Sequence, residues 1–108
     1  MLFRSRGETF VDAFGATVGG PEKVTADAVY AAQSAEVLLD AIAVSDGSRA
    51  SVAENLFTTT VTDGIMGSFA IDENGDPTRA AVTIYAIRDG KRTTVTVVTP
   101  DPGIVPKG

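Results

Sequence analysis

The sequence contains no cysteine, no histidine and no tryptophan. Without cysteine there is neither a disulfide framework nor a thiol nucleophile, and without histidine there is no Ser/His/Asp triad and no usual general base near neutral pH. Zinc sites built from these two residue types are excluded as well. We therefore expect a protein that is not an enzyme and that holds no cofactor.

Basic residues and long apolar runs are also scarce. The chain has 9 Lys plus Arg against 14 Asp plus Glu, a formal net charge of -5, and its scattered basic residues do not favour nucleic-acid binding. No stretch approaches the roughly 18 consecutive apolar residues of a membrane span. The opening MLFRSRGETF has no apolar run behind its arginines, so we expect neither a signal peptide nor membrane insertion.

The chain is long enough, at 108 residues and 44% hydrophobic content, for one domain with a modest core. From residue 10 to residue 18, apolar residues recur at helical spacing, and the run Gly19-Gly20-Pro21 supplies a stop. This pattern predicts a first helix over residues 7–17.

A second helix is predicted after Thr25, which can cap it, with Asp27 in its first turn. Apolar residues form a broad face along this helix until the run Ser45-Asp46-Gly47 ends it. Its many alanines lose little side-chain entropy and allow a neighbouring helix or sheet to approach closely. We expect this helix to be a core element.

A third, short helix is predicted next. Ser51-Val52-Ala53-Glu54 matches a capping box, and Ser48 can cap the helix one turn earlier instead. In either case Leu56 and Phe57 should face inward. The helical region then ends at about residue 57.

Beyond residue 58 the composition changes to β-branched residues, which predicts strands. Asn74-Gly75 and Asp89-Gly90 are turn signals between them, and the second should form the stronger hairpin. Apolar residues alternate on both faces of the run 81–88, so we expect at least one face to be covered. The strands are expected at residues 58–62, 68–71, 81–88 and 93–99.

Three prolines and two glycines make residues 100–108 a flexible tail rather than a strand or helix. The predicted organisation is a single domain over residues 1–99, with helices over about 7–57 and strands over about 58–99. Its fold class is α/β, or α+β in isolation. It comprises about three helices followed by a small β-meander or hairpin.

The run DENGD, residues 72–76, alternates carboxylate and amide groups as an EF-hand calcium loop does at its first, third and fifth positions. The later requirements fail, because Pro77 stands where a glycine must bend the loop and Thr83 stands where a bidentate glutamate is needed. We interpret the run as a turn that uses Asn74 and Gly75 for positive backbone dihedrals, and we expect no metal site.

The order of these elements resembles the C-terminal part of type I periplasmic (solute-)binding proteins, and in particular the branched-chain amino-acid ABC transporter substrate-binding family. The resemblance covers about residues 7–99 and depends on the order and spacing of several motifs. They are FVDAF before Gly-Gly-Pro, YAAQ opening AEVLLDAIAVSDGSRASVAENLF, and GIMGSFAIDENGDPTRAAVTIYAIRDGK.

Members of this family have two α/β lobes joined by a three-stranded hinge, with the ligand in the cleft between them. The resemblance implies that this chain is only the closing segment, a partial type I periplasmic-binding-protein fold. Residues 7–57 would belong to the first lobe, residues 81–99 would cross back to the second, and residues 76–81 would lie near the hinge. Such a piece should leave apolar faces uncovered, so we expect a homo-oligomer that completes the fold, with elements exchanged between copies as one way to do so.

The function implied is that of an extracytoplasmic solute-binding protein, in the periplasm or on the cell surface as a lipoprotein. It would capture amino acids or similar small molecules for an ABC permease, and this segment alone should not bind the ligand. The alternative is a small self-associating structural domain or truncated gene product without ligand function.

Two residues are candidates for ligand contact, because the stretch before the YAAQ helix can form a side wall of the family's cleft. They are Thr25 and Tyr30. Each also has a structural interpretation, Thr25 as a helix cap and Tyr30 as a packed residue with its hydroxyl bonded. Carboxylates on the helices should be solvated, and none are paired in a pattern that indicates acid/base catalysis. These carboxylates are Glu36, Asp40 and Glu54.

Overall fold

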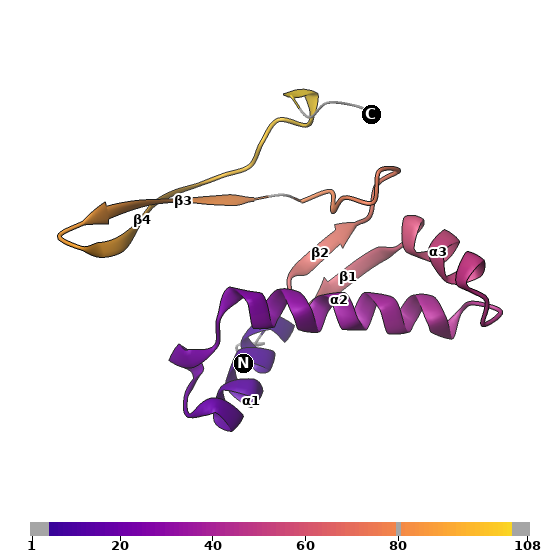
Figure 1. Ribbon diagram of the computed structural model, residues 1–108, viewed down its shortest axis with the longest axis horizontal. Coiled ribbons are helices and arrows are strands. Elements are labelled where there is room, and N and C mark those ends of the chain that lie inside the picture. The colour runs from indigo at the N-terminus through magenta and orange to yellow at the C-terminus, as the bar shows by residue number, and fades with distance from the viewer. Residues whose placement is uncertain (1–4, 80, 105–108) are drawn as a thin grey trace.

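The computed structural model describes residues 5–79 and 81–104, and in these residues three α-helices precede two antiparallel hairpins (Figure 1). This confirms the predicted mixed fold and its order of elements. The helices are α1 (Arg6–Val18), α2 (Ala26–Ala43) and α3 (Arg49–Phe57), and the strands are β1 (Thr60–Gly64), β2 (Gly67–Ala70), β3 (Val82–Arg88) and β4 (Lys91–Val98). Two 3-10 turns, η1 (Pro21–Lys23) and η2 (Pro102–Ile104), complete the description.

Helix α1 is closed at both ends by local hydrogen bonds. The Glu8 amide donates to the Ser5 hydroxyl at 3.2 Å, and the Ser5 amide donates to the Glu8 carboxylate at 2.9 Å, which is a capping box. At the other end Gly19 adopts the left-handed conformation with φ 96°, and the Gly20 amide donates to the Gly15 carbonyl at 2.8 Å. The predicted glycine stop is therefore correct.

An ion pair joins α1 to α2. The Arg6 guanidinium donates to the Glu36 carboxylate, and Glu36 is only partly exposed. The prediction that Glu36 lies on a solvated face is therefore wrong, because α1 folds back beside it. Asp40 and Glu54 are exposed as predicted.

Helix α2 begins after Thr25, which occupies the N-cap position, although its side chain makes no capping hydrogen bond. The helix ends at Ala43, just before the predicted stop. The helix carries apolar side chains on most of its sides. Three of them, Leu38, Leu39 and Ile42, are 45%, 64% and 46% exposed. A helix that is apolar on most sides is normally buried within a larger structure. Within this chain α2 is central but incompletely covered (Figure 1).

The link to α3 is a hydrogen-bonded turn. The Ser51 amide donates to the Ser48 hydroxyl at 3.2 Å, so Ser48 caps α3 and the capping box predicted at Ser51 is wrong. The pKa of Asp46 is lowered chiefly by a hydrogen bond from the Ser48 hydroxyl and, in second place, by one from the Ser48 amide. The Asn55 amide group donates to the Ala41 carbonyl at 3.2 Å and holds α3 against α2.

The first hairpin pairs β1 with β2 across Ile65 and Met66. Its first strand starts at Thr60 instead of residue 58, because Thr58 caps α3 and the amides of Thr58 and Thr59 bond to carbonyls in the last helical turn. The Asn74-Gly75 turn does not join two long strands. The residues on its two sides pair only through an isolated bridge between Ile71 and Pro77.

The second hairpin, β3–β4, projects away from the helices (Figure 1). Its turn has positive φ at Asp89 and Gly90, 52° and 73°, as the Asp-Gly signal predicts. No residue of β3 or β4 is buried. The expectation that one face is covered is therefore wrong for the single chain, since neither face is buried by any other part of residues 5–79 and 81–104.

The chain has almost no core. Among the described residues only Gly15, Gln33, Ala41 and Gly64 are buried. The accessible surface is 8303 Å², against about 5,700 Å² for a folded monomer of this mass. The radius of gyration is 16.7 Å, against about 13 Å for a compact domain of this length. Apolar side chains of α2 and of the β3–β4 hairpin are left uncovered within the described residues.

Within the predicted tail, residues 102–104 form the 3-10 turn η2, and the Gly103 amide donates to the Asp101 carboxylate at 2.8 Å. This short turn is the only departure from the predicted absence of helix in the described part of the tail. Residues 105–108 of the predicted tail lie outside the described residues.

Gly15 offers a test of the packing between α1 and η1. A Cβ there would stand 2.7 Å from the Pro21 Cα and 2.8 Å from the Pro21 nitrogen, both backbone atoms. Helix propensity alone would make Gly15→Ala stabilising by about 1 kcal/mol. We expect the steric overlap to dominate and to lower the free energy of unfolding by about 1–3 kcal/mol, measured by denaturant titration followed by circular dichroism.

The matched control is Ala16→Gly at the exposed neighbouring position, which should cost only about 0.5–1 kcal/mol through backbone entropy. A more stable Gly15→Ala variant would show that α1 and η1 do not approach as described.

Candidate functional site

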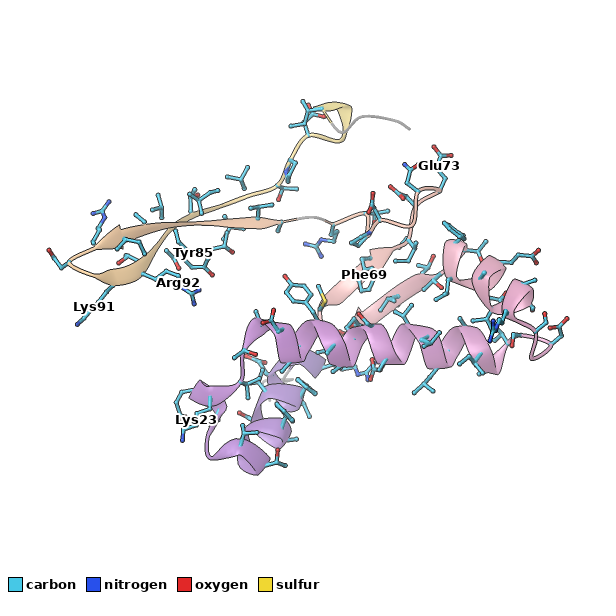
Figure 2. All side chains as sticks on the ribbon, viewed as in Figure 1. Lys23, Phe69, Glu73, Tyr85, Lys91 and Arg92 are labelled. Carbon is cyan, nitrogen blue, oxygen red and sulfur yellow. The ribbon has the colours of Figure 1, made fainter. Side chains whose placement is uncertain are left out.

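A groove of about 410 Å³ lies between α2 and the β1–β2 hairpin. Its wall is mainly apolar, with contributions from α2, α3 and β2, and Phe69 projects from β2 (Figure 2). The apolar lining includes Val37, Leu38, Leu56, Met66, Phe69 and Ile71.

Gln33 is the polar residue that builds the groove. Its side chain is 3% exposed, and its Oε1 accepts a hydrogen bond from the Met66 amide at 3.0 Å. A Cβ on Gly64 would lie 2.5 Å from this oxygen, so glycine is needed for the hairpin to approach α2. Gln33 is the last residue of the YAAQ motif and was not predicted as a site residue. An amide among the apolar residues of a core helix is the signal that could have found it.

Three further polar side chains line the groove, those of Tyr30, Ser34 and Arg79, and the Ser34 hydroxyl donates to the Tyr30 carbonyl. Tyr30 is 53% exposed, and its hydroxyl makes no hydrogen bond with the described residues. The alternative interpretation of Tyr30, a packed residue with its hydroxyl bonded, is therefore wrong. Arg79 is the groove's single cation. The groove can thus cover an apolar partner and offer it the Tyr30 hydroxyl and the Arg79 guanidinium.

The two predicted ligand residues are separated by the structure. Tyr30 lines the groove, whereas Thr25 stands at the N-cap of α2 and does not line it. Thr25 occupies the N-cap position, as its structural interpretation predicts, but its hydroxyl makes no capping hydrogen bond. Of the predicted pair only Tyr30 therefore belongs to the groove, and Gln33 joins it there as a residue that was not predicted.

The acidic loop at residues 72–76 uses its first carboxylate internally. One oxygen of Asp72 accepts hydrogen bonds from the amides of Asn74 and Asp76, both at 2.9 Å. Gly75 has φ 87°, whereas Asn74 keeps a negative φ, so only the glycine supplies the predicted positive dihedral. In residues 5–79 and 81–104 no group of three acidic side chains is arranged to hold a metal ion.

Comparison of the chain with protein-family models, with curated proteins and with solved structures finds no match. None of the described helices is long and apolar enough to cross a membrane. The site must therefore be interpreted from its own geometry and from the motifs of the sequence.

Replacing Gln33 tests whether one hydrogen bond holds the groove together. In Gln33→Leu the Met66 amide, which takes part in a part-buried hydrogen bond, loses its acceptor, and the net loss of such a bond costs about 0.5–1.5 kcal/mol. We expect the free energy of unfolding to fall by that amount and the Met66 amide to exchange faster with deuterium.

Ser34→Ala is the control for that change, because Ser34 is exposed and its hydroxyl donates only to the Tyr30 carbonyl. It should alter stability by less than about 0.5 kcal/mol. Unchanged exchange of the Met66 amide in Gln33→Leu would contradict the assigned bond.

Calcium provides the test of the acidic loop. Because Asp72 already bonds two backbone amides and the later ligand positions are wrong, millimolar calcium should leave the melting temperature unchanged, measured by calorimetry with magnesium as control. A rise of several degrees with calcium, absent with magnesium, would overturn the interpretation of the loop as a turn.

Proposed function

We propose that this chain is a segment of an extracytoplasmic solute-binding protein that captures amino acids or similar small molecules for an ABC transporter. The proposal draws first on the resemblance of residues 7–99, whose motifs occur in the family's order. No covalent chemistry is assigned to the protein, and its job is to bind and deliver. The delivery partner would be the ABC permease.

The observation that carries the proposal is the uncovered state of α2. A domain that is complete in itself buries its most apolar helix, yet Leu38, Leu39 and Ile42 stay about half exposed or more. These side chains point to a missing layer of structure, as in one lobe from which the sheet has been removed. The same holds for the hairpin β3–β4, which has no covering layer.

In the complete protein the two lobes would close on the ligand by a shift between open and closed populations about a hinge. The helices would belong to one lobe. Residues 76–81, which leave the first hairpin and enter β3, would be one crossing between lobes. Tyr30 would be the residue of this segment nearest to a ligand role.

A small self-associating structural domain is the second candidate function. The observation that favours it is the same exposed apolar surface, because a second copy can cover it without any ligand. The two functions differ in whether coding sequence for another lobe is joined to this one.

The decisive experiment sequences the genomic DNA upstream of the codon for Met1. We expect an open reading frame that continues in frame through a lobe-sized region to an export signal. The longer protein should then bind a branched-chain or aromatic amino acid by calorimetric titration, and a Tyr30→Ala variant should bind it more weakly. A stop codon directly upstream would instead favour the self-associating domain.

The 108-residue chain serves as the control in that titration. It should release no heat with leucine, valine or phenylalanine, because its groove offers a single guanidinium and no carboxylate for the ammonium group. Stoichiometric binding by the short chain would contradict the proposal that the cleft requires a second lobe.

A further inference from the structure

The chain exposes more surface than a folded monomer should. The excess over the expected monomer surface is about 2,600 Å². Obligate homodimers bury about 2,000–5,000 Å² in total, so covering only half of this excess on each of two copies would suffice for a stable dimer. The area therefore matches what a second copy of the chain can cover.

Two separate apolar surfaces are exposed. One is the groove wall, where Tyr30 and Leu38 are 53% and 45% exposed. The other is the hairpin β3–β4, where Val82, Ile84 and Val98 share one face, because Val82 pairs with Val98 and alternate residues of a strand point the same way. They are 47%, 43% and 45% exposed.

The other face of the hairpin is less suited to an apolar groove. There the Arg92 guanidinium lies 4.7 Å from the centre of the Tyr85 ring, and both side chains are seen on the hairpin in Figure 2. Covering this face would take a guanidinium out of water without a carboxylate partner, which is costly. The alternation also places Arg88 and its pair Lys91 on the face of Val82, but at the turn, so the part formed by Val82, Ile84 and Val98 can be covered with both cations left in water.

The elements that carry the two surfaces differ in net charge. The groove lining itself has one charged side chain, Arg79, and Glu36 and Asp40 of α2 lie outside it. Helix α2 carries Asp27, Glu36 and Asp40 and no lysine or arginine. The hairpin from residue 82 to residue 98 has one acidic residue, Asp89, and three basic ones. Docking the hairpin near α2 brings unlike net charges together, whereas docking one hairpin against another brings like charges together.

A second copy fits better than the same chain's own hairpin. The Thr78 amide donates to the Ala70 carbonyl at 2.8 Å, and the Ala70 amide donates to the Thr78 hydroxyl at 3.0 Å, so the chain is held at the groove rim up to Thr78. Strand β3 begins at Val82, so only a short link joins this fixed point to the hairpin, and covering its own groove would need a tight reversal in that link. Exchange with a second copy needs no such reversal.

We propose that two copies of this chain form a reciprocal dimer in which the β3–β4 hairpin of each copy covers the groove between α2 and β1–β2 of the other. The face of Val82, Ile84 and Val98 lies against the groove. This dimer goes beyond the proposed transport function, and the DNA test of that function does not depend on its outcome. Each copy receives one hairpin and gives one, as a closed two-fold assembly requires.

Sedimentation velocity of the unmodified chain from low to high micromolar concentration is the first test. We expect a monomer–dimer equilibrium with a dissociation constant of about 10 µM or tighter, as an interface of this size supports. A monomer at every concentration would overturn the proposal, and so would assembly that continues past the dimer.

Two pairs of neighbouring residues supply matched variants. Leu38→Glu changes the groove and Leu39→Glu changes the helix surface outside it, while Ile84→Glu and Ile87→Glu lie on opposite faces of β3. We expect Leu38→Glu and Ile84→Glu each to weaken the dimer at least about tenfold, because a charge would be buried, and their partners to weaken it less than about threefold. Equal effects within either pair would overturn the assigned faces.

The absence of cysteine makes a final test possible in the intact chain. Leu38→Cys and Ile84→Cys chains, tagged differently, are mixed and treated with a short bis-maleimide. We expect cross-links mainly between the two different variants, and few when Leu39→Cys replaces Leu38→Cys. Cross-linking mainly between two Ile84→Cys chains would overturn the proposal in favour of hairpin-to-hairpin contact. Circular dichroism of each variant checks that the helices are retained, and glutamine replaces glutamate in any variant that loses them.

Discussion

The hydrogen bond from the Met66 amide to the buried side chain of Gln33 fixes the position of the first hairpin on α2. The two residues that this bond joins are 33 positions apart in the chain. The bond therefore sets the distance between α2 and the first hairpin, and with it the width of the groove between them. Gly64 allows the close approach, since any side chain there would overlap Gln33. The helices and the first hairpin form one unit through these contacts.

The apolar surfaces of α2 and of the second hairpin are exposed in the single chain. Helix α2 is apolar on most sides, and the second hairpin exposes both faces, so the free energy gained by burial is not realised within one chain. A two-stranded hairpin alone is only marginally stable in water. Either further structure of a longer protein or a second copy would supply the missing contacts. The proposed function and the proposed dimer each name a structure that would cover the apolar surface left exposed by the single chain.

The elements that could be predicted are those fixed by neighbouring residues. The glycine stop after α1, the Asp89-Gly90 turn and the length of α2 depend on local conformational preferences, and the predicted positions agree with the structure within a few residues. The errors arose where two local signals competed or where a distant element intervened. Ser48 outcompeted Ser51 as a cap because Asp46 orders the preceding turn, and Glu36 met Arg6 only because α1 folds back.

The sequence by itself therefore determined the mixed fold class, the order of the elements and the absence of the residue types that most enzymes need. Only the tertiary structure decided that β2 pairs with β1, that Gln33 is buried while Tyr30 is exposed, and that Thr25 lies outside the groove. The reason is physical. Helix caps and turns are set by a few adjacent residues, whereas strand partners, burial and grooves depend on contacts between residues far apart in the chain, which periodicity and composition do not encode.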